Sequence, residues 1–278
     1  MMTVVLACGA RVILFSIFLA IAPFVRSRTS YMCLPGTKNP NCFRVLISGA
    51  GPAGLLSAHA LMQHSRKFGS NPLYRIRILD SRGDPRLLDS SKSSRSYSLG
   101  LNIRGQSAVK YFDSDHYLWN AINLEGVESD SFFLHIGNKF KLQIRKPLKK
   151  NSKQMIPPTL LIPRYRLCAA LLDTLEKAKN LHNDSAQNSS FPIDVTFDVA
   201  LKSVDLNKKI AYLSDGTSEA YDLIIGSDGV NSALRKQMEL EDSPEEPFIC
   251  EESLLPGKFK VKFLSSRNIE FLSLINFE

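Results

Sequence analysis

The chain has 278 residues, of which 44% are hydrophobic and 22% charged, a balance typical of a globular protein with a sizeable core. The net charge is +8 at pH 7, but its basic runs carry too few aromatic residues to predict a nucleic-acid partner. Five cysteines without a Cys-x-x-Cys pair, and histidines without ligand spacing, predict no metal site.

The N-terminal segment 1–40 has the pattern of a targeting segment or membrane anchor. Val12–Val25 is an uncharged run of 14 residues flanked by Arg11 and Arg26. This run is too short for a membrane-spanning helix, which needs about 20 residues. Its length is typical of the apolar part of a signal peptide. The basic, acid-free stretch 26–30 is typical of a transit peptide. We therefore expect an organelle (plastid or mitochondrion) or a secretory-pathway membrane as destination, with a retained anchor as the alternative.

Residues 43–80 predict a strand, a glycine turn, a helix and a second strand. Phe43–Ser48 is an apolar run that leads directly into a glycine-rich turn, and Tyr74–Asp80 alternates between apolar and polar residues. Glycines let the backbone approach a pyrophosphate closely, and the N-terminus of the following helix attracts its charge. We expect this turn to bind a dinucleotide through Gly49, Gly51, Pro52, Ala53 and Gly54.

Asp80 ends the second predicted strand, where an acidic side chain accepts hydrogen bonds from the adenosine ribose. It lies 31 residues after Gly49, beyond the usual spacing of about 20, and the polar insertion 64–72 accounts for the difference. We expect Asp80→Ala to weaken dinucleotide binding and barely to affect folding.

The rest of the chain continues the α/β pattern. An amphipathic helix is expected over 164–179, with strands over 193–201, 209–213 and 222–225. Asp215-Gly216 predicts a hairpin turn between two of these strands.

A second glycine motif follows the last of these strands. The strand runs into Gly226-Ser-Asp-Gly229 and then into a helix that carries Arg235. Gly226 and Gly229 permit close backbone approach, Asp228 supplies a fixed acceptor, and Arg235 offsets phosphate charge.

Both motifs resemble those of the flavoprotein monooxygenases. Residues 49–55 are similar to the family's FAD fingerprint, and residues 222–235 to its second signature, the Asp-Gly motif. The resemblance covers about residues 44–238. It implies an α/β fold, with a Rossmann-like FAD-binding domain and an incomplete β-sheet substrate domain.

Three further segments resemble the kynurenine 3-monooxygenases within that family. They are Asp80-Ser81-Arg82, the stretch from Arg95 to Gly105, and the stretch from Thr159 to Leu167. The resemblance implies FAD contacts at Ser81, Arg82, Arg95 and Arg164, and Arg166 is the alternative to Arg164.

The family pattern also divides the chain. We expect the FAD-binding domain over 41–240, interrupted by substrate-domain strands at about 125–160, and the start of the substrate domain over 241–278. The family's third signature, Gly-Asp followed by Ala-Ala-His, is not found after Arg235. On that ground we expect a truncated chain that does not complete a catalytic cycle.

The function implied by the resemblance is that of an FAD-dependent oxidoreductase, a monooxygenase that takes electrons from NAD(P)H and hydroxylates an aromatic or similar small molecule. No catalytic side chain is assigned, because the flavin carries the chemistry. Phe132 stands where the kynurenine enzymes place a substrate-binding arginine, which disfavours kynurenine as substrate. The alternatives are a flavin-dependent reductase of the geranylgeranyl type and an inactive FAD-binding remnant.

Overall fold

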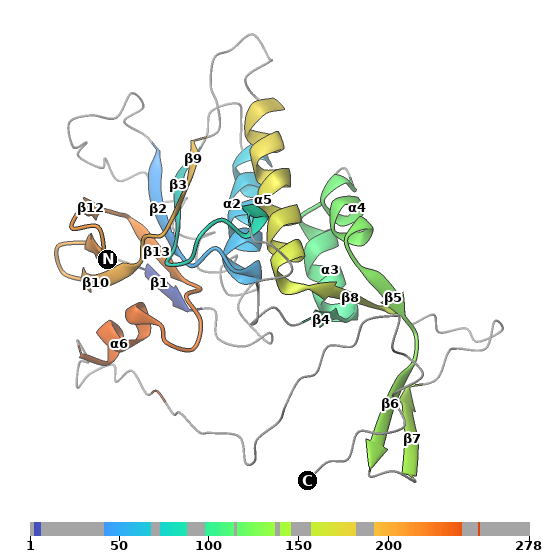
Figure 1. Ribbon diagram of the computed structural model, residues 1–278. Coiled ribbons are helices and arrows are strands. Elements are labelled where there is room, and N and C mark those ends of the chain that lie inside the picture. Colours follow the sequence, from blue (N-terminus) through green and yellow to red (C-terminus); the bar gives the residue numbers. More distant parts are fainter. Residues whose placement is uncertain are drawn as a thin grey trace.

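A five-stranded parallel sheet forms the centre of the molecule (Figure 1). The computed structural model describes residues 3–6, 42–67, 73–87, 98–113, 116–136, 140–145, 157–181, 192–240 and 250. The sheet has the order β1-β13-β2-β3-β9, and each neighbouring pair is parallel. Its strands are β1 (Thr3–Leu6), β2 (Phe43–Ser48), β3 (Tyr74–Asp80), β9 (Ile193–Phe197) and β13 (Leu223–Gly226).

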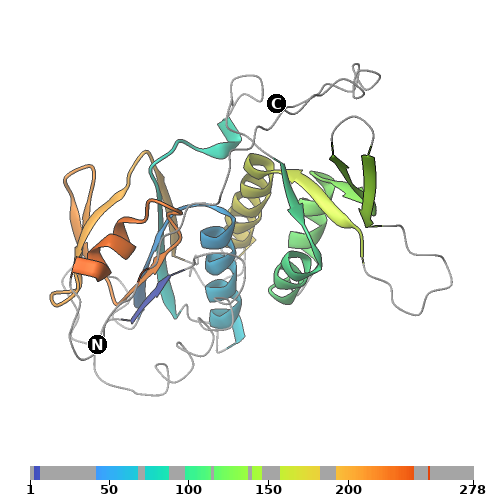
Figure 2. The same cartoon turned by 90° about the horizontal axis from the view of Figure 1, so that it is seen from below.

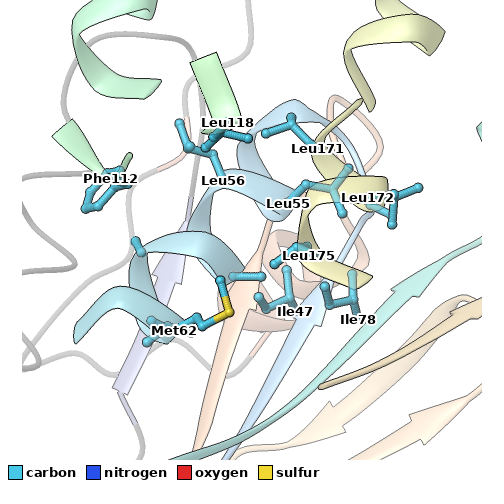
Figure 3. Packing of buried hydrophobic residues seen from close by; sticks show 14 of the residues in the cluster. Ile47, Leu55, Leu56, Met62, Ile78, Phe112, Leu118, Leu171, Leu172 and Leu175 are labelled. Atoms are coloured by element: carbon cyan, nitrogen blue, oxygen red, sulfur yellow. The ribbon is translucent and has the colours of Figure 1, made fainter. Parts of the chain in front are cut away.

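Helices α2 (Pro52–Lys67) and α5 (Arg164–Leu181) cover one face of this sheet. Alternate strand residues such as Ile47 and Ile78 point toward them and are fully buried. Figure 3 shows these two side chains with Leu55 of α2 and Leu175 of α5 in the same cluster. The period of two along each strand thus directs one set of side chains to the face that the two helices cover.

The other face of the sheet is covered by an antiparallel meander and a short helix. The meander consists of β10 (Leu201–Asp205), β11 (Ile210–Leu213) and β12 (Ser218–Ala220), and the helix is α6 (Ala233–Leu240). Figure 2 shows α6 (orange) on the opposite side of the sheet from α2 (blue). Leu46 and Ile224 point to this side and are fully buried. Burial on both faces explains why β2 and β13 are continuous apolar runs.

A smaller antiparallel sheet of order β4-β8-β5 lies beside the helical layer, together with two short helices. Its elements are β4 (Ser98–Leu101), α3 (Ile103–Tyr111), α4 (Tyr117–Leu124), β5 (Val127–Ser129) and β8 (Thr159–Pro163). A separate hairpin, β6 (Phe132–Ile136) and β7 (Phe140–Arg145), extends away from it in Figure 1. The 3-10 turn η1 (Pro85–Leu87) is tied to α5, because Arg86 pairs with Glu176 at 2.7 Å.

The predicted α/β class, the strand–turn–helix–strand unit and the amphipathic helix are confirmed. The single strand predicted over 193–201 is wrong, because β9 ends at Phe197 and β10 begins at Leu201. Between them Asp198 has a φ of 60°, a left-handed conformation that turns the chain out of the parallel sheet. Residues 3–6, which belong to the expected targeting segment or anchor, pair in parallel with β13. Among the described residues, none of the helices has the length and apolar character needed to cross a membrane.

A buried histidine joins α2 to α5. His59 is 4% exposed, and its Nε2 lies 3.0 Å from the carbonyl oxygen of Leu171. The Oγ1 of Thr174 lies 3.3 Å from the same nitrogen. Burial lowers the pKa of His59 to about 4, so the ring is neutral in the folded chain at neutral pH.

This histidine predicts a pH-dependent stability. An unfolded histidine titrates near pH 6.5, so between that pH and about 4 the unfolded chain binds a proton that folded His59 does not. The contribution of His59 to the free energy of unfolding is therefore fully present above pH 6.5. It falls toward pH 4, by on the order of 3 kcal/mol for this group. Burial also lowers the pKa of His64, which adds a loss of the same sign. Urea unfolding from about pH 7 down to about pH 4.5 measures the loss.

Two variants separate His59 from the other titrating groups. His59→Gln should flatten the fall in unfolding free energy, because the amide does not titrate. The matched control is His116→Asn, which replaces an exposed histidine of left-handed conformation with a residue that tolerates that conformation. The control should keep the wild-type slope, and an unchanged slope in His59→Gln would contradict the assignment.

Candidate functional site

The two glycine motifs meet at the carboxyl ends of neighbouring strands. β13 pairs with β2 in a register that places Gly226 beside Ser48, so the residues that follow both strands lie side by side. The amide of Ser227 donates to the carbonyl of Ser48 at 2.7 Å. Its hydroxyl lies 2.9 Å from the carbonyl oxygens of both Ser48 and Gly49. In open parallel sheets, this edge is where ligands bind.

The opposite ends of the same two strands are clamped by an ion pair. Arg44 donates from Nε and Nη2 to the two carboxylate oxygens of Asp222, each at 3.1 Å. The Arg44 amide donates to the same carboxylate at 2.8 Å, and the Asp222 amide donates to the Arg44 carbonyl at 3.0 Å. A two-pronged, half-buried pair of this kind fixes the alignment of the strands as well as their contact.

Packing explains two of the three turn glycines. Gly49 has a φ of 105°, and a Cβ there would overlap the backbone of Ser227. A Cβ on Gly54 would overlap the carbonyl oxygen of Gly49 and the hydroxyl of Ser227. Gly51 is different, because the one atom of the described residues that lies near a Cβ built there is Nη2 of Arg164, at 3.2 Å. The fold therefore requires glycine at 49 and 54, whereas at 51 a side chain would meet, among the described residues, a flexible guanidinium.

Arg164 stands at the start of α5, directly after β8, and is half-buried. No hydrogen bond or ion pair of its guanidinium is found among the described residues. Arg166 is exposed and pairs with Glu125 at 3.2 Å. Of the two arginines left open by the sequence, the structure brings Arg164 to the glycine turn and gives Arg166 another partner.

Asp80 is buried at the end of β3 and holds the glycine turn directly. Its Oδ2 accepts the Ala50 amide at 2.9 Å, and its Oδ1 accepts the Arg82 amide at 2.9 Å. The Arg82 side chain donates to both carboxylate oxygens at 3.0 Å. Burial alone would raise the pKa of Asp80, but these hydrogen bonds outweigh it and hold the pKa below its ordinary value.

These contacts correct one expectation from the sequence. Asp80→Ala was expected barely to affect folding, yet the carboxylate holds the amide of Ala50 in the turn. Without the carboxylate a buried N–H loses its acceptor, and a group left unsatisfied in this way costs about 1–3 kcal/mol. Asp80 is thus a structural residue whatever its part in binding.

Asp228 caps α6 with one oxygen and leaves the other without a partner. Oδ2 accepts the amide of Ala233, the first residue of α6, at 3.0 Å. Oδ1 is buried, and no described residue donates a hydrogen bond to it. Buried carboxylate oxygens are normally paired, so Oδ1 is an acceptor that the described residues leave unsatisfied.

Arg235 lies in α6, and its buried side chain contacts the loop that precedes this helix. Its guanidinium donates to the carbonyl of Val230, and its amide donates to the hydroxyl of Ser232 at 3.1 Å. In this arrangement Arg235 supports the loop around Gly229, and its contact with a phosphate stays a prediction.

The remaining predicted residues are placed as follows. Pro52 and Ala53 form the first turn of α2, Gly226 is buried at the end of β13, and Ser81 is exposed after β3. Arg95 lies outside the described residues. Sequence reasoning missed Ser227 as the side chain that joins the two motifs, because nothing in a serine between two glycines signals a partner 178 residues away.

Curated relatives match most of this chain. Kynurenine 3-monooxygenase of Cryptococcus neoformans is 28% identical in a match 223 residues long, and the match covers 70% of this chain and 37% of that protein. The enzyme of Saccharomyces cerevisiae is 28% identical in a match 216 residues long, and the match covers 70% of this chain and 38% of that protein. The chain is therefore similar in sequence to kynurenine 3-monooxygenases. It spans less than two fifths of the length of these two relatives, and no protein-family model matches it.

Solved structures of oxygenases are also similar to the chain. The 2-methyl-3-hydroxypyridine-5-carboxylic acid oxygenase has a TM-score of 0.49 and 18% identity, over 71% of this chain and 42% of that one. The p-nitrophenol 4-monooxygenase of Pseudomonas putida has a TM-score of 0.47 and 17% identity, over 71% of this chain and 43% of that one.

Because the turn glycines have different surroundings, we expect the same substitution to destabilise the fold at Gly54 and to have little effect at Gly51. Gly54→Ala should lower the free energy of unfolding by about 1–3 kcal/mol, since the methyl group is forced into backbone and the Ser227 hydroxyl. Gly51→Ala should leave stability within about 0.5 kcal/mol of wild type. Denaturant unfolding of the two variants measures the contrast, and equal losses at both positions would contradict this account of the turn.

Proposed function

We propose that this chain binds FAD and forms part of an NAD(P)H-dependent monooxygenase that hydroxylates an aromatic or similar small molecule. The observation that carries the proposal is the meeting of the two motifs at one edge of the sheet, where Ser227 bonds to both Ser48 and Gly49. The relationship to kynurenine 3-monooxygenases supports the same class.

The residues at this edge fit the chemistry of a dinucleotide. The first N–H groups of a helix have no acceptor within it, so the start of α2 offers amides and a positive dipole end to a pyrophosphate. Gly51 leaves room for that group, and Arg164 offers it a cation. The unpartnered Oδ1 of Asp228 accepts a hydrogen bond from a cofactor hydroxyl or amide. Two kinds of donor and one acceptor match a ligand that has both phosphates and sugar hydroxyls.

The cofactor would supply the redox chemistry, accepting electrons from the nicotinamide nucleotide and passing them to oxygen. The role of this chain would be to bind and orient the cofactor. The N-terminus of α2 and Arg164 would offset the charge of the pyrophosphate, and the strand ends would position the backbone that approaches it. We assign no catalytic side chain. The substrate is proposed only as a class, an aromatic or similar small molecule. Neither relative named above favours a reductase of the geranylgeranyl type.

FAD binding tests this proposal directly. The purified 278-residue chain should bind FAD in a calorimetric titration. Gly51→Val should weaken binding by at least about tenfold, because its side chain fills the space in front of the turn, while leaving the melting temperature close to wild type. The control is Ser218→Val, a substitution at an exposed strand position outside both motifs. No FAD binding by the wild-type chain, even after reconstitution, would sink the proposal.

We further propose that residues 1–40 direct the chain to an organelle or to a secretory-pathway membrane. The uncharged run Val12–Val25 between basic residues supports this. A fluorescent fusion of residues 1–40 should leave the cytosol, and Ile17→Asp within the run should return it there. A fusion that stays diffuse in the cytosol without the substitution would refute the proposal.

A further inference from the structure

The carboxylate of Asp80 has no place left for a ligand. A carboxylate accepts about four hydrogen bonds, two on each oxygen. Oδ1 receives the amide and the Nε of Arg82, at 2.9 and 3.0 Å. Oδ2 receives the amide of Ala50 and the Nη2 of Arg82, at 2.9 and 3.0 Å. A sugar diol that is to bind Asp80 must therefore displace one of these donors.

Of the described donors to Asp80, those of the Arg82 side chain are the ones whose displacement does not require the backbone of the site to move. The Ala50 amide belongs to the glycine turn. The backbone of the Asp80–Arg82 loop is held by two further bonds, from the Val199 amide to the Asp80 carbonyl at 3.1 Å and from the Asp198 amide to the Arg82 carbonyl at 3.2 Å. The Arg82 side chain is 58% exposed, whereas that of Asp80 is 6% exposed. Rotation of the guanidinium toward solvent opens two acceptor positions and moves no backbone.

In its contact with Asp80, the Arg82 guanidinium lies beside the turn that would receive a pyrophosphate. Arg82 Nη2 and the Ala50 amide converge on the same oxygen of Asp80, and Ala50 stands between Gly49 and Gly51. The buried Cys168 thiol of α5 lies near both Arg82 and Arg164. Burial raises its pKa to about 11, against the lowering effect of the nearby Arg164 and Arg82. Arg82 and Arg164 are therefore two cations around one turn.

We propose that Arg82 covers the ribose position in the ligand-free chain and is drawn off Asp80 by the phosphates of the incoming ligand. This rests on the proposed dinucleotide function and adds a selection step to it. A ligand with both a ribose and a pyrophosphate replaces the Asp80–Arg82 pair with two contacts, one to each partner. An uncharged nucleoside breaks the pair and gives Arg82 nothing in return. Arg82 thus positions the site for adenosine diphosphate groups and against free nucleosides.

Calorimetric titrations of the full chain with adenosine and with ADP test this proposal. Arg82→Ala should tighten adenosine binding by about fivefold, the strength of one partly exposed ion pair. The same variant should weaken ADP binding by about tenfold, because a charge-assisted phosphate contact is lost. Arg82→Lys keeps the charge but lacks the fork that brackets both oxygens. It should tighten adenosine binding and keep ADP affinity closer to wild type.

The matched control is Arg75→Ala, which removes the same charge from an exposed position on the same strand and should change neither affinity. Loss of both ligands in Arg82→Ala and in Arg82→Lys would show that Arg82 only supports the loop, and would overturn the proposal. Adenosine affinity unchanged in both variants would overturn it as well. These outcomes are distinct from failure of the proposed function, in which the wild-type chain binds neither ADP nor FAD.

Discussion

The pairing of β2 with β13 is the contact on which the proposed site depends. The two strands are 178 residues apart in sequence, so their alignment has to be fixed by specific bonds as well as by the ladder. The Arg44–Asp222 pair fixes one end, and the Ser227 hydroxyl fixes the other. A shift of one residue would turn every side chain of a strand to the other face, and both motifs would then lose their position at the edge.

Burial on both faces of the sheet makes such a shift costly. Ile47 packs under α2 and α5, and Leu46 packs under the meander. Both side chains are fully buried, as is Ile224 of β13. The two hydrophobic layers therefore fix which side chains of each strand face each side of the sheet. The polar bonds at the strand ends set the register of the strands. Together they place the two glycine motifs side by side at one edge of the sheet.

Local sequence patterns predicted the parts of the fold that depend on local physics. The apolar run of β2, the glycine turn and the period of α5 each contain their own signal, and the structure has each of them. The break at Asp198 was not predicted, because a left-handed aspartate between two strand-like segments leaves the alternation intact. Ser227 and the choice between Arg164 and Arg166 depend on which segments meet in space, which no single window of sequence contains.

Asp80, a proposed binding residue, also has a structural part in the glycine turn. A buried carboxylate is unfavourable unless it is paired or hydrogen-bonded, and here Arg82 supplies a cation from two residues away. The same carboxylate orders the turn through the Ala50 amide, so the phosphate position is shaped before any phosphate arrives. The sequence predicted cofactor contacts at Asp80 and at Arg82, but it did not predict that the two side chains would form an ion pair with each other. On the proposed selection step, this one ion pair would both compensate the buried carboxylate and select for charged ligands.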